Sequence, residues 1–270
     1  MTRSVAHCAA FFLVGSKEQI QSKLLDPAIK GIENILATCS KTPTIKKVIL
    51  TGTVLTVSAD FRPSVTNPEY TISEADWESS CSETLWPYVY SKVVQEKRAI
   101  EIAASQSQYD LSILAIGGTF GPMCSTHGTG VSAMVLKYIR LGLFFPAVPK
   151  MAIPMNDVRD VAAIHSLVMS SAKAKGRYLP PQKLVSFYEI CDGLRTDPRT
   201  WRPLLPLCHF PDCFKGVFAC LLPHLGFDSA MAERLWGAQG RVDSSKVCEG
   251  SLAVASPARC LAPPSRAPAV

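Results

Sequence analysis

The stretch that decides the fold is KKVILTGT, residues 46–53. Its β-branched and aliphatic side chains predict a buried strand that runs into a loop. SVAHCAA (4–10) and DLSILAIGGTFGP (110–122) read as two further buried strands, the second of which stops at its glycines. Helix patterns over 24–41 and 86–104 separate the three strands. This alternation predicts an α/β fold with a parallel sheet, right-handed crossovers and helices on both faces.

Two helices carry recognisable start signals. Asp26 can cap the first helix, and Pro27 can sit in its first turn. An apolar stripe follows at Ile29, Ile32, Ile35 and Leu36. In residues 155–172 Asp157 can cap a helix with Asp160 three residues later, and we interpret this helix as structural.

The remaining segments lack a buried-strand pattern. The polar stretch 59–85 predicts a loop that could cover a pocket, and 204–240 predicts a helical cap region. Residues 251–270 are rich in Ala, Pro and Ser without periodicity, so we expect a disordered tail. We therefore divide the chain into a cofactor-binding domain (1–150), a substrate-binding cap region interleaved with it (151–250) and this tail.

Composition narrows the class of protein. With 270 residues and 47% hydrophobic content, the chain can bury a sizeable core. The net charge of +6 is spread without a dense basic block, which indicates neither a nucleic-acid surface nor a membrane-surface helix. The apolar runs are much shorter than the roughly 20 residues that span a bilayer. The amino-terminal apolar run has some features of a signal peptide, but the pattern favours a strand.

Ten cysteines are scattered at irregular spacing, which favours reduced thiols and a cytoplasmic location over a disulfide framework. The densest group of zinc-type ligands is Cys208, His209, Cys213, Cys220 and His224. Its gaps match no paired Cys-x-x-Cys knuckle, so we favour thiols packed on an amphipathic helix and expect no metal.

The stretch WPYVYSKVVQE (86–96) contains a candidate acid/base pair. Tyr88 and Lys92 are four residues apart and share one helix face, whereas Tyr90 points elsewhere. A tyrosine becomes a useful proton donor at neutral pH when a nearby cation favours its phenolate. The same spacing also fits an ordinary solvated helix surface, so the surroundings must decide.

The predicted topology brings this pair to a sheet edge. Ligands of open parallel sheets bind beyond the carboxyl ends of the strands. Thr51 to Thr53 and Gly117 to Thr119 occupy such ends, and Tyr88 begins the helix between those two strands. We therefore expect three separate segments to converge on one crevice.

These residues resemble a known family. The segments AHCAAFF (6–12), DPAIKGIENIL (26–36), KKVILTGT, EADWESSCSETLWPYVYSK (74–92) and DVRDVAAIH (157–165) follow its order. They are similar to the extended short-chain dehydrogenase/reductases of the NAD-dependent epimerase/dehydratase superfamily, in the dihydroflavonol-4-reductase-like and aldehyde-reductase-like branch. The resemblance covers roughly residues 5 to 247.

The resemblance implies reduction of a ketone or aldehyde, or the reverse oxidation of an alcohol, by hydride transfer with NADP or NAD. Tyr88 would be the general acid, and Lys92 would lower its pKa and bind the nicotinamide ribose. Thr53, at a position that usually holds serine in this family, would hydrogen-bond the substrate oxygen. The implied cofactor-binding residues are Ala9, Ala10, Thr51, Tyr88, Lys92, Gly117, Gly118 and Thr119.

Besides Thr53, the sequence departs from the family in two further places. Ala115-Ile116 replaces the family's asparagine-proline before Gly117, which alters the wall beside the nicotinamide. The chain also begins at the family's fourth strand, so we expect a partial Rossmann-like sheet that lacks the first βαβ units and their Gly-rich pyrophosphate loop, with a small helical carboxyl-terminal region. Weak affinity for NADP or NAD follows from that expectation.

Two functions remain open at this point. One is an amino-terminally incomplete reductase acting on a small carbonyl or alcohol substrate. The other is a catalytically inactive homologue that binds a partner. An exposed edge at the first strand would suit pairing with a second copy or another partner. Neither nucleic acid nor a membrane is expected as a partner.

Overall fold

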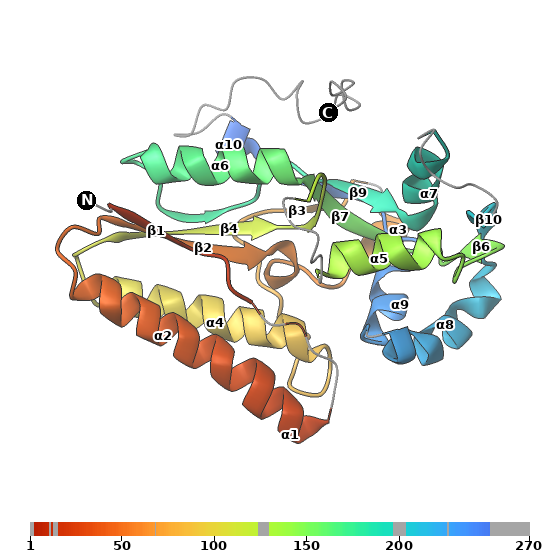
Figure 1. Ribbon diagram of the computed structural model, residues 1–270, viewed down its shortest axis with the longest axis horizontal. Helices are drawn as coiled ribbons and strands as arrows, with labels where there is room; N and C mark the ends of the chain where they lie inside the picture. The colour runs from red at the N-terminus through yellow and green to blue at the C-terminus, as the bar shows by residue number, and fades with distance from the viewer. Residues whose placement is uncertain are drawn as a thin grey trace.

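The main sheet is parallel, as predicted. The computed structural model describes residues 3–10, 12, 16–67, 69–123, 130–196, 204–225 and 227–248. The sheet has the strand order β1-β2-β4-β8 (Figure 1). Its strands are β1 (Ser4–His7), β2 (Lys47–Thr53), β4 (Asp110–Ile116) and β8 (Gly176–Tyr178). Within the described part of the chain, β1 pairs only with β2, so β1 forms one edge of this sheet.

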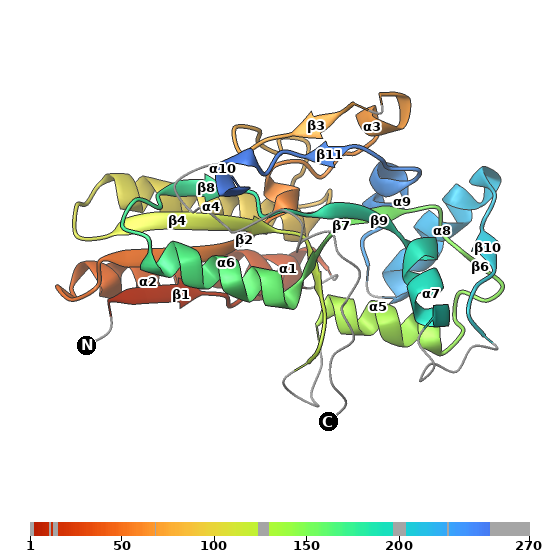
Figure 2. The same ribbon diagram turned by 90° about the horizontal axis from the view of Figure 1, so that it is seen from above.

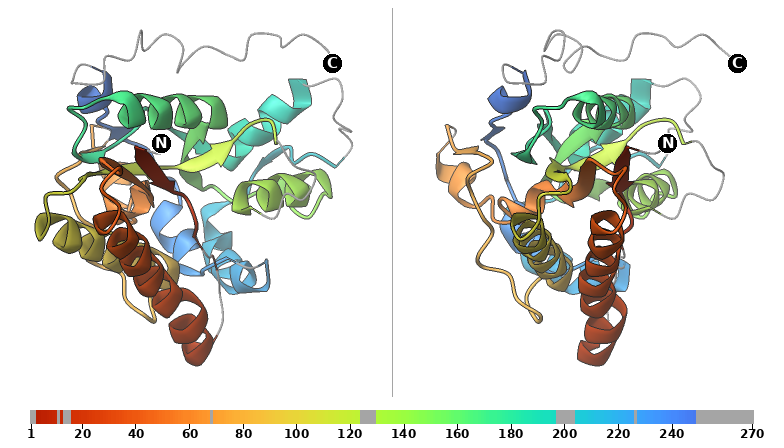
Figure 3. Two further views of the ribbon diagram at one scale, coloured as in Figure 1. Left: turned by 60° about the vertical axis from the view of Figure 1, so that its left-hand side comes forward. Right: turned by 90° about the vertical axis from the view of Figure 1, so that its left-hand side faces the viewer.

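Helices cover both faces of the sheet (Figures 1 and 3). Helices α2 (Asp26–Ser40) and α4 (Pro87–Ala104) pack side by side below it, and α6 (Val158–Ser170) lies above. The protein here has three layers, with the sheet between α2 and α4 on one side and α6 on the other. Successive side chains of β2 point to opposite faces of the sheet and pack against these two helical layers in turn. Val48 and Leu50 join the core under α2 and α4, whereas Ile49 packs toward α6.

The first helical segment begins earlier than predicted. Ser16 caps α1 (Lys17–Ile20) in a reciprocal capping box with Gln19. A π-helical turn, Gln21–Leu25, then leads directly into α2. The prediction of Asp26 as the cap was wrong: the residue before α2 is itself helical, and Asp26 instead accepts hydrogen bonds from Gln21 and Lys30. Pro27 does lie at the start of α2, as expected.

The starts of α4 and α6 match the sequence signals. Asp157 caps α6 by accepting from the Arg159 amide at 2.8 Å. Pro87 stands in the first turn of α4, directly after Trp86. Trp86 has left-handed backbone angles (φ 58°), which is rare for a bulky residue. Its ring is buried, so packing holds this strained entry to the helix.

A second region adjoins the carboxyl ends of the main strands (Figure 2). Its sheet has the order β5-β7-β9, with β7 and β9 antiparallel. These strands are β5 (Gly118–Phe120), β7 (Ala152–Asp157) and β9 (Lys183–Ser186). The predicted strand 110–122 is therefore two strands: β4 ends before Gly117, and β5 continues in the second sheet.

The other segments form short elements, most of them around this second sheet, whereas the last described helix packs beside α6 over the main sheet. Two strand pairs are β6 (Ala147–Val148) with β10 (Cys208–His209), and β3 (Thr71–Ile72) with β11 (Arg241–Val242). The helices are α3 (Pro63–Thr66), α5 (Val131–Arg140), α7 (Phe187–Thr196), α8 (Lys215–Leu221), α9 (Ala230–Leu235) and α10 (Ser245–Cys248). The predicted loop 59–85 thus contains α3 and β3, and the predicted cap region 204–240 is mainly helical. The predicted tail 251–270 lies outside the described residues.

Candidate active site

One cavity gathers most of the predicted site residues. It has a volume of about 360 Å³ and lies where β2 and β4 end. Ala10, Thr53, Tyr88, Gly117, Gly118 and Thr119 all line it. Segments from both predicted regions contribute, since Phe227 and Met231 close the cavity from the carboxyl-terminal half. Ala9, Thr51 and Lys92 are not among its lining residues.

Tyr88 reaches this cavity from the first turn of α4. Its ring meets the edge of the Phe12 ring with centroids 5.0 Å apart. Burial raises the pKa of the Tyr88 hydroxyl. Among the described residues the hydroxyl has no hydrogen-bond partner, so neither Lys92 nor Thr53 contacts it directly. The tyrosine therefore presents an available O–H group to the cavity.

Thr53 is the last residue of β2 and lies opposite Ile116 at the end of β4. Its Oγ1 accepts a weak 3.4 Å hydrogen bond from the Leu55 amide, which caps the short 3-10 turn Val54–Thr56. This turn bends the chain away from the sheet. Among the described residues the Thr53 hydroxyl proton has no acceptor, so it is available to an oxygen atom in the cavity.

Lys92 lies one turn beyond Tyr88 and is 5% exposed. Its ammonium donates a 2.8 Å hydrogen bond to Oε1 of Gln95. Burial lowers the pKa of Lys92 to about 8, although Glu96 and Cys8 act in the opposite direction. The ammonium also lowers the pKa of His7, in addition to the larger effect of burial on that imidazole. Lys92 is therefore directed toward the end of β1.

Thr51 does not face the cavity. Its Oγ1 lies 3.1 Å from the Cys8 sulfur and 2.9 Å from Nε2 of His165 in α6. The other ring nitrogen of His165 lies 2.8 Å from the Val161 carbonyl oxygen, which can only accept. In the neutral imidazole Nδ1 is thus protonated, so Nε2 and the Cys8 sulfur are the two acceptors available to the single Thr51 hydroxyl proton. Ala9 follows β1 at an exposed position beside Cys8.

Asn156, which the sequence analysis did not single out, holds the cavity wall at Gly117 in place. The Gly117 amide donates to Oδ1 of Asn156 at 2.6 Å, and Nδ2 of Asn156 donates to the Pro181 carbonyl at 2.7 Å. A Cβ atom on Gly117 would lie 2.6 Å from Oε1 of Gln182 and would collide with the Pro154 carbonyl. Asn156 therefore holds the β4–β5 junction from β7. In the sequence Asn156 stands only as the residue before the predicted helix cap Asp157, a position that gives no sign of this contact.

The cavity has no charged wall. Its lining includes no Asp, Glu, Lys, Arg or His side chain among the described residues. The apolar side chains are Phe12, Val54, Leu55, Trp86, Phe120, Val131, Val135, Ile153, Pro154, Phe227, Met231 and Leu235. The polar side-chain groups of the described lining residues are the hydroxyls of Thr53, Tyr88, Thr119 and Ser132 and the indole N–H of Trp86. Such a lining suits an uncharged, largely apolar ligand with one polar function.

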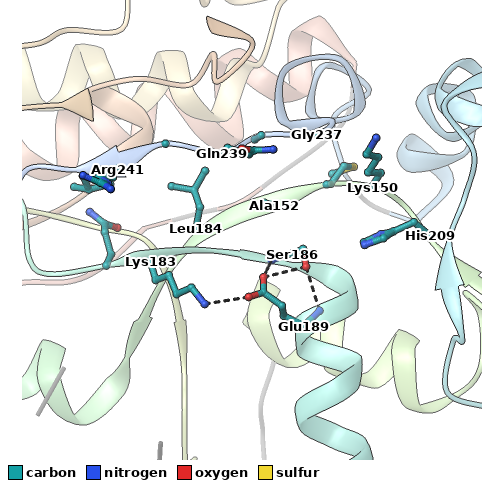
Figure 4. Close-up of a pocket in the computed structure, with 15 residues that line it drawn as sticks. Lys150, Ala152, Lys183, Leu184, Ser186, Glu189, His209, Gly237, Gln239 and Arg241 are labelled. Carbon is teal, nitrogen blue, oxygen red and sulfur yellow. Dashed lines mark hydrogen bonds and ion pairs between the residues drawn. The ribbon is translucent and has the colours of Figure 1, made fainter. Parts of the chain in front are cut away.

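A larger cavity of about 690 Å³ lies elsewhere, between β7, β9 and residues 237–242 (Figure 4). None of the predicted site residues lines it. Its cations have acidic partners: Lys183 pairs with Glu189 at 3.0 Å, Lys150 with Asp212 and Arg241 with Glu69. By volume alone this cavity would be the better candidate for the active site. However, it lacks the two hydroxyl groups, of Thr53 and Tyr88, that line the smaller cavity at the strand ends.

Neither a metal centre nor a membrane span is found in the part of the chain that the structure describes. No group of three or more His, Cys, Asp or Glu side chains there is arranged to hold a metal ion. No helix in the same ranges is long and apolar enough to cross a membrane.

Comparison with known proteins decides the family. Residues 2–179 match the NAD dependent epimerase/dehydratase family. The chain belongs to this family. Members compared with it include cinnamoyl-CoA reductase CAD2 of Medicago truncatula, 28% identical over 71% of this chain and 57% of the relative. Tetraketide alpha-pyrone reductase 2 of Arabidopsis thaliana is 30% identical over 71% of this chain and 59% of its own length.

Solved structures share the Rossmann-like fold of this family member. Yeast methylglyoxal/isovaleraldehyde reductase Gre2, complexed with NADPH, superposes with a TM-score of 0.68 at 19% identity and covers 92% of this chain and 70% of its own. Human epimerase family protein SDR39U1 (isoform 2) with NADPH gives 0.65 at 16% identity, covering 92% and 76%. The chain spans less than two thirds of the first curated relatives, between 57% and 61% of their length.

Proposed function

We propose that this protein is an NAD(P)H-dependent reductase of uncharged aldehydes or ketones, or the corresponding dehydrogenase of alcohols. The observation that carries the proposal is the meeting of Thr53 and Tyr88 in one uncharged cavity at the ends of parallel strands. Family membership adds support, and several relatives are named as reductases. NADPH is the cofactor present in both of the similar structures named above.

The residues in hand fit the nicotinamide end of such a cofactor. Gly117 lines the cavity and has no side chain, so a flat ring could lie against its backbone. Ala10, Gly118 and Thr119 continue this wall, and Lys92 lies behind it near the end of β1. A bound reduced nicotinamide would supply the hydride. Ala9 and Thr51 would act from behind the cavity wall, because neither lines it.

Tyr88 and Thr53 then divide the work on the substrate oxygen. The Thr53 hydroxyl donates a hydrogen bond to that oxygen and polarises the carbonyl group. Tyr88 transfers its proton to the oxygen as the carbonyl carbon gains hydride, so the product is an alcohol and Tyr88 becomes a phenolate. The positive charge of Lys92 favours the phenolate. Because burial alone opposes ionisation of Tyr88, this cation is needed for the step at neutral pH.

The division into a cofactor-binding part (1–150) and a substrate-binding part (151–250) belongs to the same proposal. Phe227 and Met231 support it, because they close the cavity opposite Tyr88 and Thr53. Pairing of β1 with a second copy or another partner remains a prediction.

A reductase assay tests the proposal. The purified chain is mixed with NADPH, and in parallel with NADH, and loss of the reduced cofactor is followed with isovaleraldehyde, cinnamaldehyde or pyruvate. We expect reduction of the two uncharged aldehydes and little turnover of pyruvate, because the cavity has no cation for a carboxylate. Absence of turnover with every substrate in a folded protein, together with absence of cofactor binding by calorimetry, would refute the proposal and favour a non-catalytic binding role.

A further inference from the structure

The partner of Lys92 is a buried amide. The Lys92 ammonium and Oε1 of Gln95 are 2.8 Å apart, and the two residues are 5% and 3% exposed. Both belong to α4, three residues apart. A hydrogen bond to a charged group in such a dry environment is stronger than one between neutral groups. The Gln95 side chain therefore holds the Lys92 ammonium group in place, in addition to the fixed position of the Lys92 backbone in α4.

A second helix fixes the orientation of this amide. Nε2 of Gln95 donates to the Ala28 carbonyl oxygen in α2 at 3.2 Å. A carbonyl oxygen only accepts, and an ammonium only donates. Turning the amide around would place two donors together at Lys92 and two acceptors together at Ala28. The two contacts therefore specify one orientation, with the amide oxygen toward Lys92.

Other groups near Lys92 do not replace this contact. The Glu96 carboxylate, one turn further along α4, is bound to the Arg177 guanidinium at 2.6 Å and to the Thr56 hydroxyl at 2.7 Å. His7, the last residue of β1, and Cys8 directly after it lie close enough to interact electrostatically with the ammonium. Gln95 is the neutral acceptor whose bond to Nζ the structure shows.

We propose that Gln95 is a positioning residue, which uses its anchor on α2 to hold the Lys92 ammonium in place behind the Tyr88 cavity. This inference rests on the proposed function for its catalytic meaning, but the contact itself can be tested without cofactor. A neutral acceptor holds the amine without adding a negative charge. The pKa of Lys92, lowered by burial to about 8, fits this arrangement, in which the amine is mainly but not permanently charged near neutral pH.

Titration of Lys92 by NMR is the direct test. The protein is labelled with ¹⁵N at lysine Nζ, studied without cofactor, and the Lys92 signal is assigned by its loss in Lys92→Arg. Gln95→Glu should raise the midpoint of Lys92 titration, and Gln95→Met should lower it, each by about one pH unit, because one adds a carboxylate and the other removes the acceptor. Ile100→Glu adds a carboxylate on an exposed position of α4 and should leave the midpoint unchanged.

The pH profile of kcat/KM for aldehyde reduction provides the second readout. Its basic limb should move with the NMR midpoint in Gln95→Glu and Gln95→Met. Unchanged Lys92 midpoints in both folded variants would overturn the inference and leave Gln95 with a packing role only. If Gln95→Met does not fold, Gln95→Glu alone decides, since a midpoint equal to that of the wild type contradicts the contact. Failure of the proposed function looks different: turnover is absent in every protein while the Lys92 midpoints still shift.

Discussion

The Glu96 carboxylate and the Arg177 guanidinium meet at 2.6 Å in the protein interior, where their side chains are 1% and 8% exposed. The pair joins α4, which carries Tyr88, to strand β8. Arg177 also donates to the carbonyl oxygens of Glu74 and Asp76 at 2.8 and 2.7 Å and lies over the Trp77 ring. One buried cation therefore links the helix that carries Tyr88, the edge strand β8 and residues 74–77 of the loop before that helix.

Breaking this pair should strongly destabilise the protein. Glu96→Gln leaves the Arg177 charge buried without its counterion, so the free energy of unfolding should fall by about 3–5 kcal/mol. Adding Arg177→Met to Glu96→Gln should recover part of that loss, because the uncompensated charge is then removed. Urea denaturation measures both.

The matched control is an exposed pair, Lys30 and Asp26, at 3.1 Å with side chains 70% and 39% exposed. Lys30→Met should change the free energy of unfolding by less than about 1 kcal/mol. Equal effects of Glu96→Gln and Lys30→Met would contradict the role assigned to the buried pair.

Two glycines should respond to alanine with opposite signs. Gly117→Ala places a Cβ 2.6 Å from Oε1 of Gln182 and against the Pro154 carbonyl, so it should destabilise the protein by about 1–3 kcal/mol. Gly31, in the interior of α2, has nothing within 4 Å of a built Cβ. Gly31→Ala should therefore stabilise by up to about 1 kcal/mol. Thermal denaturation of the two variants checks both signs, and a neutral Gly117→Ala would show that the wall can move.

The parallel sheet was predictable because its signals are local. The β-branched run at 46–53 and the helix that begins with Pro87 each mark themselves in sequence, and their alternation limits the topology. The start of the first helix was harder. Asp26-Pro27 is a common start signal, but here a π turn at 21–25 precedes the proline and links α2 to the capping box at Ser16. The sequence therefore contains two helix-start signals, the capping box at Ser16 and the proline at position 27. The helical segment begins at the Ser16 cap because the π turn leads into the proline without ending the helix.

The site was predictable only in part, because some of its contacts join segments that are far apart in the sequence. The spacing of Tyr88 and Lys92 is visible in the sequence, but the partner of a buried ammonium is set by what else is buried there. That partner is Gln95, because α2 holds its amide in place. The contact of Asn156 with Gly117 spans 39 residues and joins two sheets, so no local pattern announces it.

The stability of the protein should depend on Lys92 at alkaline pH. Its folded pKa of about 8 lies below the ordinary value of 10.5, so the unfolded chain holds an extra proton between these values. Keeping Lys92 charged in the folded protein therefore lowers the free energy of unfolding. This loss is complete below pH 8 and disappears as the pH rises toward 10.5. The free energy of unfolding should thus gain about 3 kcal/mol from this group across that window. Lys92→Met should remove this rise, which denaturant melts at several pH values would detect, whereas exposed Lys17→Met should retain it.

Tyr88→Phe should abolish most of the reductase activity without unfolding the protein. Phenylalanine keeps the ring that packs against Phe12, and the lost hydroxyl has no hydrogen-bond partner among the described residues. Loss of the general acid should lower kcat/KM by about 10²–10⁴-fold. Tyr90→Phe is the matched control, since Tyr90 lies on the same helix but does not line the cavity. Equal activity of the two variants would assign proton transfer to another group.

Substitutions at Thr53 should separate the need for a hydroxyl from the need for its shape. Thr53→Val keeps the branched side chain but removes the O–H group, so kcat/KM should fall by about 10²–10³-fold if this hydroxyl stabilises the substrate oxygen. It also removes the acceptor of the 3.4 Å bond from the Leu55 amide, which should reduce stability by no more than about 1 kcal/mol. Thr53→Ser keeps both the hydroxyl and the cap and should retain activity, with altered preference among bulky aldehydes because the methyl group is gone. Steady-state kinetics and denaturant melts of both variants distinguish these effects. If Thr53→Val turns over aldehydes as fast as Thr53→Ser, the substrate oxygen is bound elsewhere in the cavity.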